Sequence, residues 1–281
     1  MEQQFQDIRE QQKATWNKFS SGWKKWDDLT MNFLKPVGDE IIRQLHLKDT
    51  DIVLDVAAGT GEPGFTIAAQ LKGGKVVFSD LSDEMLAIAR EKSERNGIRN
   101  VDFIPGDVCA LPFEDNTFDA VSCRFGFMFF PDMLLAAKEM MRVLKPGGHI
   151  ATSVWGAPEK NFWITAIMGA INRNMNLPAP PPGAPGIFRC AKDGFIADLF
   201  AQAGLKNISE KEITGMLDCQ TTDAYWNYMT DIAAPVVAAL SQADDNTKDK
   251  IRNEVHQLLN DRYTNGSISI SSSATITSGQ K

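Results

Sequence analysis

The stretch that most constrains the fold runs from Asp51 to Gly64, with the sequence DIVLDVAAGTGEPG. Its apolar run, residues 52–56, stops abruptly at small residues and a Gly-Thr-Gly turn, which predicts a buried strand that enters a tight loop. Apolar residues return at helical spacing directly afterwards, so the loop opens into a helix whose first-turn N–H groups are free. A strand, a glycine loop and a helix in this order predict a site for a nucleotide or nucleoside.

The glycine spacing over residues 59–64 is followed by Asp80 and therefore also matches the dinucleotide fingerprint. An NAD-dependent oxidoreductase is accordingly one hypothesis. However, Asp55 ends the strand and Glu62 lies in the turn, and no basic residue stands beside either to offset the repulsion of a pyrophosphate. S-adenosylmethionine carries a sulfonium and an ammonium but no phosphate, so it fits this acidic loop better.

Strand-like and helix-like segments alternate along the next hundred residues. Further strands are expected at residues 76–80, 101–104 and 118–123, and a fifth strand follows a helix at about residue 143 and ends at Trp155. Helices are expected at 36–47, 83–96, 188–205 and 222–263, with a sixth strand at 207–219. This alternation predicts an α/β fold, in which a parallel sheet carries helices on both faces.

Three motifs carry a family resemblance: LPFEDNTFDAV at residues 111–121, RFGFMFF at 124–130 and RVLKPGG at 142–148. With the glycine loop, they resemble class I S-adenosylmethionine-dependent methyltransferases, most of all the branch that includes the ubiquinone and menaquinone biosynthesis C-methyltransferases. The resemblance covers roughly Asp51 to Trp155. It implies a doubly wound, Rossmann-like sheet of seven mostly parallel strands with helical cap insertions, and a methyltransferase that uses S-adenosyl-L-methionine.

The resemblance also implies roles for the polar residues at the strand ends. Asp80 would hold the ribose diol and Asp107 the exocyclic amine of adenine, although a turn aspartate that bonds its own backbone is an alternative for Asp107. Asp55 would orient the loop or the methionine ammonium, and family members often have glycine where this chain has Ala57. The expected cofactor residues are Asp55, Ala57, Gly59, Thr60, Gly61, Asp80, Leu81, Met85, Asp107, Val108 and Arg124.

The acceptor side is expected among aromatic residues beyond the fourth strand. Arg124 would be costly to bury unpaired, so it is expected to contact a carboxylate of either the substrate or the cofactor. The phenylalanines that follow it are typical of either core or site. The expected substrate residues are Arg124, Trp155, Asn161, Trp163, Tyr225 and Tyr228. The acceptor would be a small apolar or aromatic molecule, with no metal required and no catalytic base identified.

Four regions follow from these patterns. Residues 1–35 carry Trp16, Phe19 and Trp23 on one helical face and form either a lid or a helix packed on the domain. Residues 36–155 form the cofactor-binding core, and 156–190 form a proline-rich insertion. Residues 191–281 complete the core, with a helical insertion at about 222–263. Their Ser-rich end, 267–277, alternates like an antiparallel strand, with a disordered tail as the alternative.

Composition narrows the classes of partner. The 281 residues carry a net charge of -7, so no basic surface is available for nucleic acid. The four cysteines show neither the spacing of a zinc site nor that of a disulfide framework. No apolar run is long enough for stable membrane insertion, and a cytoplasmic location is expected. The oligomeric state and a noncatalytic S-adenosylmethionine-binding role stay open at this stage.

Overall fold

The computed structural model describes residues 2–179, 181, 183–264 and 266–281, while residues 1, 180, 182 and 265, including two positions of the proline-rich insertion, lie outside this description. The first half of the chain contains α1 (Glu2–Lys25), α2 (Asp27–Gln44), β1 (Ile52–Val56), α3 (Gly64–Gln70), β2 (Lys75–Asp80), α4 (Asp83–Arg95), β3 (Val101–Pro105), β4 (Phe118–Arg124), η1 (Phe127–Phe129) and α5 (Met133–Val143). The second half contains β5 (Leu144–Trp155), η2 (Pro158–Lys160), α6 (Phe162–Asn174), α7 (Phe195–Ala203), β6 (Lys206–Gln220), α8 (Thr222–Ile232), α9 (Ala234–Leu240), α10 (Asp245–Arg262) and β7 (Ile268–Gln280).

The strands form a seven-stranded sheet in the order β3-β2-β1-β4-β5-β7-β6. Strands β1 to β5 pair in parallel, and β7 lies antiparallel between β5 and β6. The predicted fold is thus confirmed, and the Ser-rich end of the chain is a strand with apolar residues at buried positions. The strand order reverses between β1 and β4, where doubly wound sheets bind their ligands.

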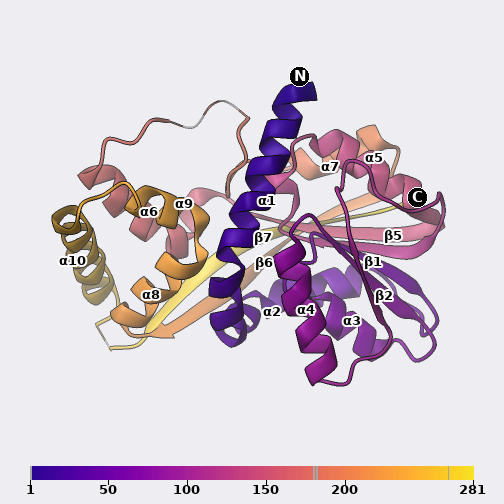
Figure 1. Ribbon diagram of the computed structural model, residues 1–281, viewed down its shortest axis with the longest axis horizontal. Helices are drawn as coiled ribbons and strands as arrows, with labels where there is room; N and C mark the ends of the chain where they lie inside the picture. Colours follow the sequence, from indigo (N-terminus) through magenta and orange to yellow (C-terminus); the bar gives the residue numbers. More distant parts are fainter. Residues whose placement is uncertain (1, 180, 182, 265) are drawn as a thin grey trace.

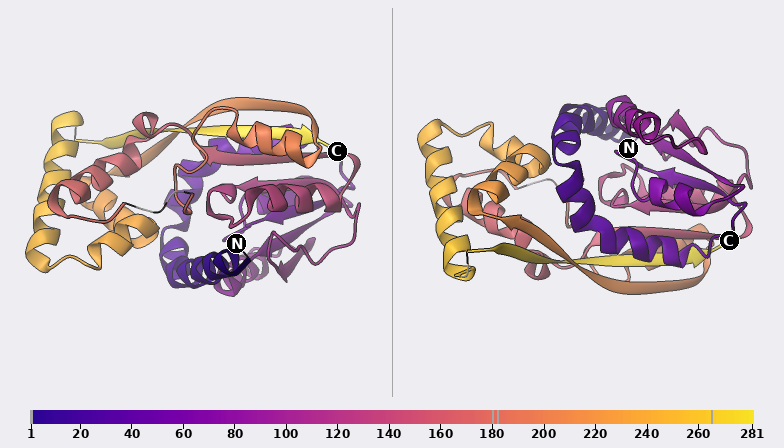
Figure 2. Two further views of the ribbon diagram at one scale, coloured as in Figure 1. Left: turned by 90° about the horizontal axis from the view of Figure 1, so that it is seen from above. Right: turned by 90° about the horizontal axis from the view of Figure 1, so that it is seen from below.

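Two helical groups extend this sheet (Figures 1 and 2). Helices α6, α8, α9 and α10 gather at one end of the molecule and form the cap, which the long strands β6 and β7 connect to the sheet. Helix α1 stands between the cap and the nucleotide-binding half, packed against α4. The acceptor side of the sheet is therefore bounded by elements that are distant in sequence.

Several helix boundaries differ from the predictions. Pro36 lies inside α2 rather than at a helix start, because the buried face of α2, which includes Phe33, Val37 and Ile41, continues through it and outweighs the lost hydrogen bond. The helix predicted at 188–205 begins only after Gly194, which has a φ of 76°. The block 222–263 is three helices, and the proline-rich insertion contains α6.

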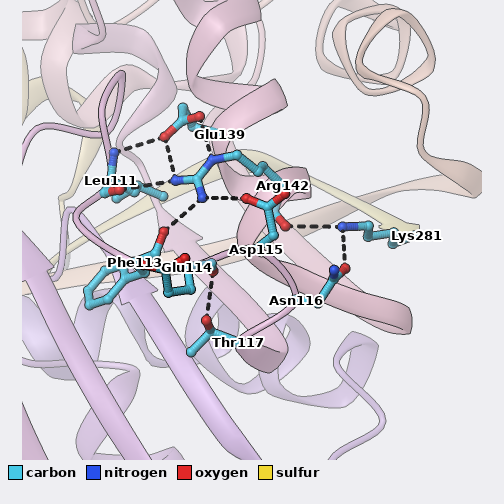
Figure 3. Close-up of polar contacts among 9 residues, drawn as sticks. All are labelled: Leu111, Phe113, Glu114, Asp115, Asn116, Thr117, Glu139, Arg142 and Lys281. Carbon is cyan, nitrogen blue, oxygen red and sulfur yellow. Dashed lines mark hydrogen bonds and ion pairs between the residues drawn. The ribbon is translucent and has the colours of Figure 1, made fainter.

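Two of the three motifs that carry the family resemblance meet in a polar network around Arg142 of α5 (Figure 3). Its guanidinium donates to the carbonyl oxygens of Leu111 and Phe113 at 3.0 and 2.7 Å, and to the Asp115 carboxylate at 2.8 Å. Glu139 pairs with it one turn earlier on the same helix, at 2.8 Å. LPFEDNTFDAV and RVLKPGG are therefore coupled structurally: the helix before β5 fixes the loop before β4.

Candidate cofactor and acceptor site

A cavity of about 190 Å³ lies at the carboxyl-terminal edge of the parallel strands. Its wall is formed by the loop after β1, the segments after β2 to β5, and by α1, α2, α8 and α9. Twelve predicted site residues line it: Ala57, Gly59, Thr60, Asp80, Leu81, Met85, Asp107, Val108, Arg124, Trp155, Trp163 and Tyr228. Residues predicted for the cofactor and residues predicted for the acceptor therefore line the same cavity.

Asp80, at the end of β2, is fixed by backbone donors. The N–H of Gly59 donates to its Oδ2 at 2.9 Å, and the N–H of Ser82 donates to its Oδ1 at 2.8 Å. Burial raises the pKa of the Asp80 carboxyl, against the effect of these hydrogen bonds. Each oxygen keeps acceptor capacity toward the cavity, so the carboxylate is suited to hold a diol.

The glycine loop is held in a conformation that explains its composition. Ala57 has a φ of 52°, a left-handed conformation that glycine adopts without strain and alanine adopts less readily, which accounts for the glycine expected at this position. Gly61 has a φ of 105°, and a Cβ there would lie 2.1 Å from the ring of Phe65. Gly61 and Asp55 do not line the cavity but support the loop from behind.

Asp55 is only 1% exposed and lies beneath this loop. The hydroxyl of Ser122 donates to its Oδ1 at 2.6 Å. Burial raises the pKa of the Asp55 carboxyl to about 7, which the Ser122 hydrogen bond and the positive charge of Arg124 only partly counteract. This position suits orientation of the loop better than direct contact with a ligand.

Asp107 has the turn hydrogen bond that was weighed from the sequence, and it also lies at the cavity. The N–H of Cys109 donates to its Oδ1 at 3.0 Å, which is the turn geometry, while the residue also lines the cavity. Its Oδ2 lies 2.6 Å from Nε of Arg9 on α1. This ion pair was missed in the sequence, because nothing in the local pattern near Arg9 relates it to a residue almost a hundred positions away.

Helix α1 covers the cavity. Arg9, Gln12, Trp16 and Trp23 line it, and the ring of Trp16 packs edge-on against Phe129 at 5.1 Å between centroids. Outside the cavity, the hydroxyl of Ser82 donates to Asn17 at 2.6 Å and ties α1 to α4. Of the aromatic face predicted for this segment, Trp16 and Trp23 thus face the cavity, together with polar residues that were not singled out, whereas Phe19 does not line it.

The acceptor side is an aromatic cluster around Trp155. The ring of Phe125 stacks on Trp155 at 4.2 Å between centroids, and the ring of Trp163 is tilted against Trp155 at 4.7 Å. Phe33 of α2 stacks on the same indole at 5.8 Å. Tyr228 closes this region with its hydroxyl 3.3 Å from that of Thr30. These rings make a wall suited to a flat, apolar molecule.

Two residues predicted for the acceptor site serve the structure instead. The Asn161 side chain is fully buried, donates to the carbonyl oxygens of Gly156, Ala157 and Ser273, and accepts from Trp163 Nε1. The Tyr225 hydroxyl donates to the carbonyl oxygen of Trp163 at 2.7 Å, and neither residue lines the cavity. Their hydrogen-bonding capacity is used inside the protein, and the structure does not bring Asn161 and Tyr225 to the cavity.

Arg124 ends β4 and faces the cavity between the glycine loop and the aromatic cluster. Its guanidinium donates to the sulfur of Met31 at 3.4 Å, and within the described ranges no carboxylate lies within 4.0 Å of it. Burial lowers the pKa of Arg124, while Asp55, Glu62 and Asp27 favour its charged form from a distance. The structure thus presents a cation to the cavity without a direct counterion.

The histidines lie elsewhere in the part of the chain that the structure covers. The rings of His46 and His149 are in tilted contact, with 4.8 Å between their centroids, and His256 of α10 lies 3.6 Å from Asp223. None of the three lines the cavity. Across the same described residues, no helix is long and apolar enough to cross a membrane, and no group of three or more ligating side chains is arranged for a metal.

Comparison with known proteins agrees with this geometry. Residues 15–163 match the model of the ubiE/COQ5 methyltransferase family. The demethylmenaquinone methyltransferase of Bacillus subtilis is 30% identical over 208 residues, which cover 68% of this chain and 82% of that protein.

Two solved structures share the fold. A SAM-dependent methyltransferase from Aquifex aeolicus aligns with a TM-score of 0.52 at 23% identity. The alignment covers 69% of this chain and 91% of the Aquifex chain. Phosphoethanolamine N-methyltransferase 2 of Haemonchus contortus, in complex with S-adenosyl-L-methionine, has a TM-score of 0.54 at 19% identity, over 89% of this chain and 54% of its own. The sequence matches decide between the cofactor classes: the chain belongs to the ubiE/COQ5 methyltransferase family and is an S-adenosylmethionine-dependent methyltransferase.

Proposed function

We propose that this enzyme methylates a small aromatic acceptor of the quinol or phenol type. The observation that carries the proposal is the single cavity in which the loop after β1, Asp80 and Asp107 adjoin the aromatic cluster of Phe125, Trp155 and Trp163. The B. subtilis relative is named as acting on demethylmenaquinone, which is an aromatic acceptor of this kind. The stacked rings favour a flat acceptor over a compact polar one.

In this proposal the residues at the strand ends each contact a different part of the cofactor. Asp80 accepts hydrogen bonds from the ribose hydroxyls, and Leu81, Met85 and Val108 contact the faces of the adenine. Asp107 accepts from the exocyclic amine, while Ala57, Gly59 and Thr60 follow the methionine portion. The fit rests on the acceptor capacity that the buried Asp80 keeps toward the cavity and on the acidity of the loop, which suits a cationic ligand.

S-adenosylmethionine would supply an electrophilic methyl group bound to a sulfonium. The acceptor attacks this methyl carbon in line with the carbon–sulfur bond, and S-adenosylhomocysteine leaves. The protein's work is then to orient the acceptor and exclude water. Trp155, Trp163 and Tyr228 hold the acceptor ring, and α1 closes the cavity through Trp16 and Arg9. We propose accordingly that residues 1–35 act as a lid over a core at 36–155, and that residues 156–190 and 222–263 shape the acceptor site.

Calorimetric titration with S-adenosylmethionine, S-adenosylhomocysteine and NAD tests the cofactor side of the site. Both sulfur ligands are expected to bind and NAD is not. A panel of phenols, quinols and aliphatic amines, assayed with labelled S-adenosylmethionine, then tests the acceptor class. Methyl transfer to aliphatic amines but not to phenols or quinols would refute the proposed acceptor.

A further inference from the structure

The Arg124 guanidinium has an unusual environment for a partly buried cation. Its hydrogen bond in the described part of the chain is to the weak acceptor sulfur of Met31, at 3.4 Å. Burial disfavours its charge, yet a guanidinium stays protonated in proteins. A cation held in an enclosed, mostly apolar cavity is costly unless an anion is supplied to it. The arrangement therefore indicates that a ligand carries that anion.

The neighbouring carboxylates are engaged with other partners. Asp55 accepts from Ser122 at 2.6 Å, and Glu62 accepts from the hydroxyl of Thr66 at 2.8 Å. Asp27 is paired with the ammonium of Lys92 at 2.8 Å. All three act on Arg124 only over a longer range. Apart from the one donated to Met31, the guanidinium N–H groups are thus left for the cavity.

The position of Arg124 connects it with the aromatic cluster. Its chain neighbour Phe125 has a φ of 59° and donates its N–H to the Ser153 hydroxyl at 3.1 Å. The Phe125 ring stacks on Trp155, and both rings line the same cavity as Arg124. A ring held by the cluster could place an oxygen substituent near Arg124. Tyr228 of the cap, which lies on the acceptor side, also interacts electrostatically with Arg124.

We propose that Arg124 binds the ionised oxygen of the acceptor and lowers the pKa of that hydroxyl, so that the phenolate or quinol monoanion is the form that is methylated. This inference rests on the proposed function. Since no histidine lines the cavity in the described part of the chain, electrostatic stabilisation of the anion takes the place of a histidine base.

The step is balanced without a further reactant. The acceptor hydroxyl loses its proton to water, and the resulting anion attacks the methyl carbon through oxygen or through a conjugated ring carbon. The methyl–sulfur bond breaks and its electron pair stays on sulfur, so the positive charge of the sulfonium and the negative charge of the acceptor disappear together. After attack through carbon, the ring C–H proton leaves to water and aromaticity is restored.

The test uses 4-nitrophenol, whose ionised form absorbs visible light, as a probe bound to the full chain in the presence of S-adenosylhomocysteine. The bound probe is expected to ionise about one pH unit lower than the free probe, because a nearby cation favours the anion. Arg124→Gln is expected to abolish this shift, and Arg124→Lys to retain part of it. Arg189→Gln is the matched control, since Arg189 donates to the carbonyl oxygen of Phe130 and does not line the cavity.

S-adenosylhomocysteine affinity, measured on each variant, separates this inference from the proposed function. Unchanged affinity in Arg124→Gln together with a lost probe shift supports the inference. An equal probe shift in the wild type and in Arg124→Gln overturns it, as does a wild type that leaves the probe unperturbed. A selective loss of S-adenosylhomocysteine affinity with the shift intact would assign Arg124 to the cofactor's carboxylate. Failure of the wild type to bind S-adenosylhomocysteine would instead refute the proposed function.

Discussion

Polar groups are buried in both the core and the cap, but they are satisfied to different degrees. In the cap region, Asn161 and Tyr225 are fully buried and make their hydrogen bonds within the protein. In the core, Asp55 is buried with its pKa raised to about 7, and Arg124 faces the cavity without a carboxylate within 4.0 Å in the described residues. Arg124, which lacks a direct counterion, lines the cavity, whereas Asn161 and Tyr225, whose hydrogen bonds are made within the protein, do not.

The largest effect should come from Asp55, through the pH dependence of stability. Its folded pKa of about 7 lies above the unfolded value, so the unfolded chain loses this proton first and stability falls as pH rises from about 4 to about 7. The unfolding free energy of the ligand-free protein should fall by about 2 kcal/mol between pH 5 and pH 8 on this account. Asp55→Asn should remove that fall, as checked by urea unfolding at both pH values. An identical pH dependence in the variant would show that other titratable groups cause the fall in stability.

Asp80→Ala should weaken S-adenosylhomocysteine binding by about 1 to 3 kcal/mol, because charge-assisted hydrogen bonds to the ribose are lost. The control is Asp102→Ala, which removes a half-exposed carboxylate paired with Lys75 at 2.7 Å on the neighbouring strand. Calorimetry should show a normal affinity for the control. If both variants bind alike, Asp80 does not belong to the cofactor site and the contrast between core and cap weakens.

Tyr225→Phe should act on stability alone. Loss of its hydrogen bond to the carbonyl oxygen of Trp163 should lower the unfolding free energy by about 1 kcal/mol, because that carbonyl stays buried. S-adenosylhomocysteine affinity should not change. Tyr263→Phe, at a partly exposed tyrosine, is the control and should leave both quantities near the wild-type values. A changed methylation rate at unchanged stability would return Tyr225 to the acceptor site.

The smallest effect is expected at Arg9. Its partly exposed pair with Asp107 ties α1 to the adenine end of the cavity, and such pairs contribute about 0.2 to 1 kcal/mol. Arg9→Ala should therefore raise the dissociation constant of S-adenosylhomocysteine roughly two- to fivefold. The control is Lys13→Ala, at another residue of α1 that does not line the cavity. This variant removes an ion pair with Asp83 of α4 and should leave the dissociation constant unchanged. Equal affinities of the two variants would argue against a lid anchored at Asp107.

The core was predictable because its signals are local. A buried strand, a glycine loop and a capped helix each depend on residues a few positions apart, as with Ser82, whose hydroxyl accepts from the N–H of Met85. Because parallel strands end at one edge, Asp80 and Asp107 could be placed together before any coordinates were known. No comparable local rule applies to the cap. Aromatic and amide composition alone pointed to Asn161 and Tyr225, which the structure does not bring to the cavity.

The sequence by itself determined the order of strands and helices, the acidic glycine loop and the family. The reason is that the spacing of apolar residues and the residue types of turns depend only on neighbouring positions in the chain. Only the tertiary structure decided which polar groups satisfy one another, since those partners are distant in sequence. It paired Arg9 with Asp107, bound Asn161 to Ser273 and left Arg124 facing the cavity with a methionine sulfur. The physical reason is that desolvation and hydrogen-bond geometry depend on distances that form only when the whole chain packs.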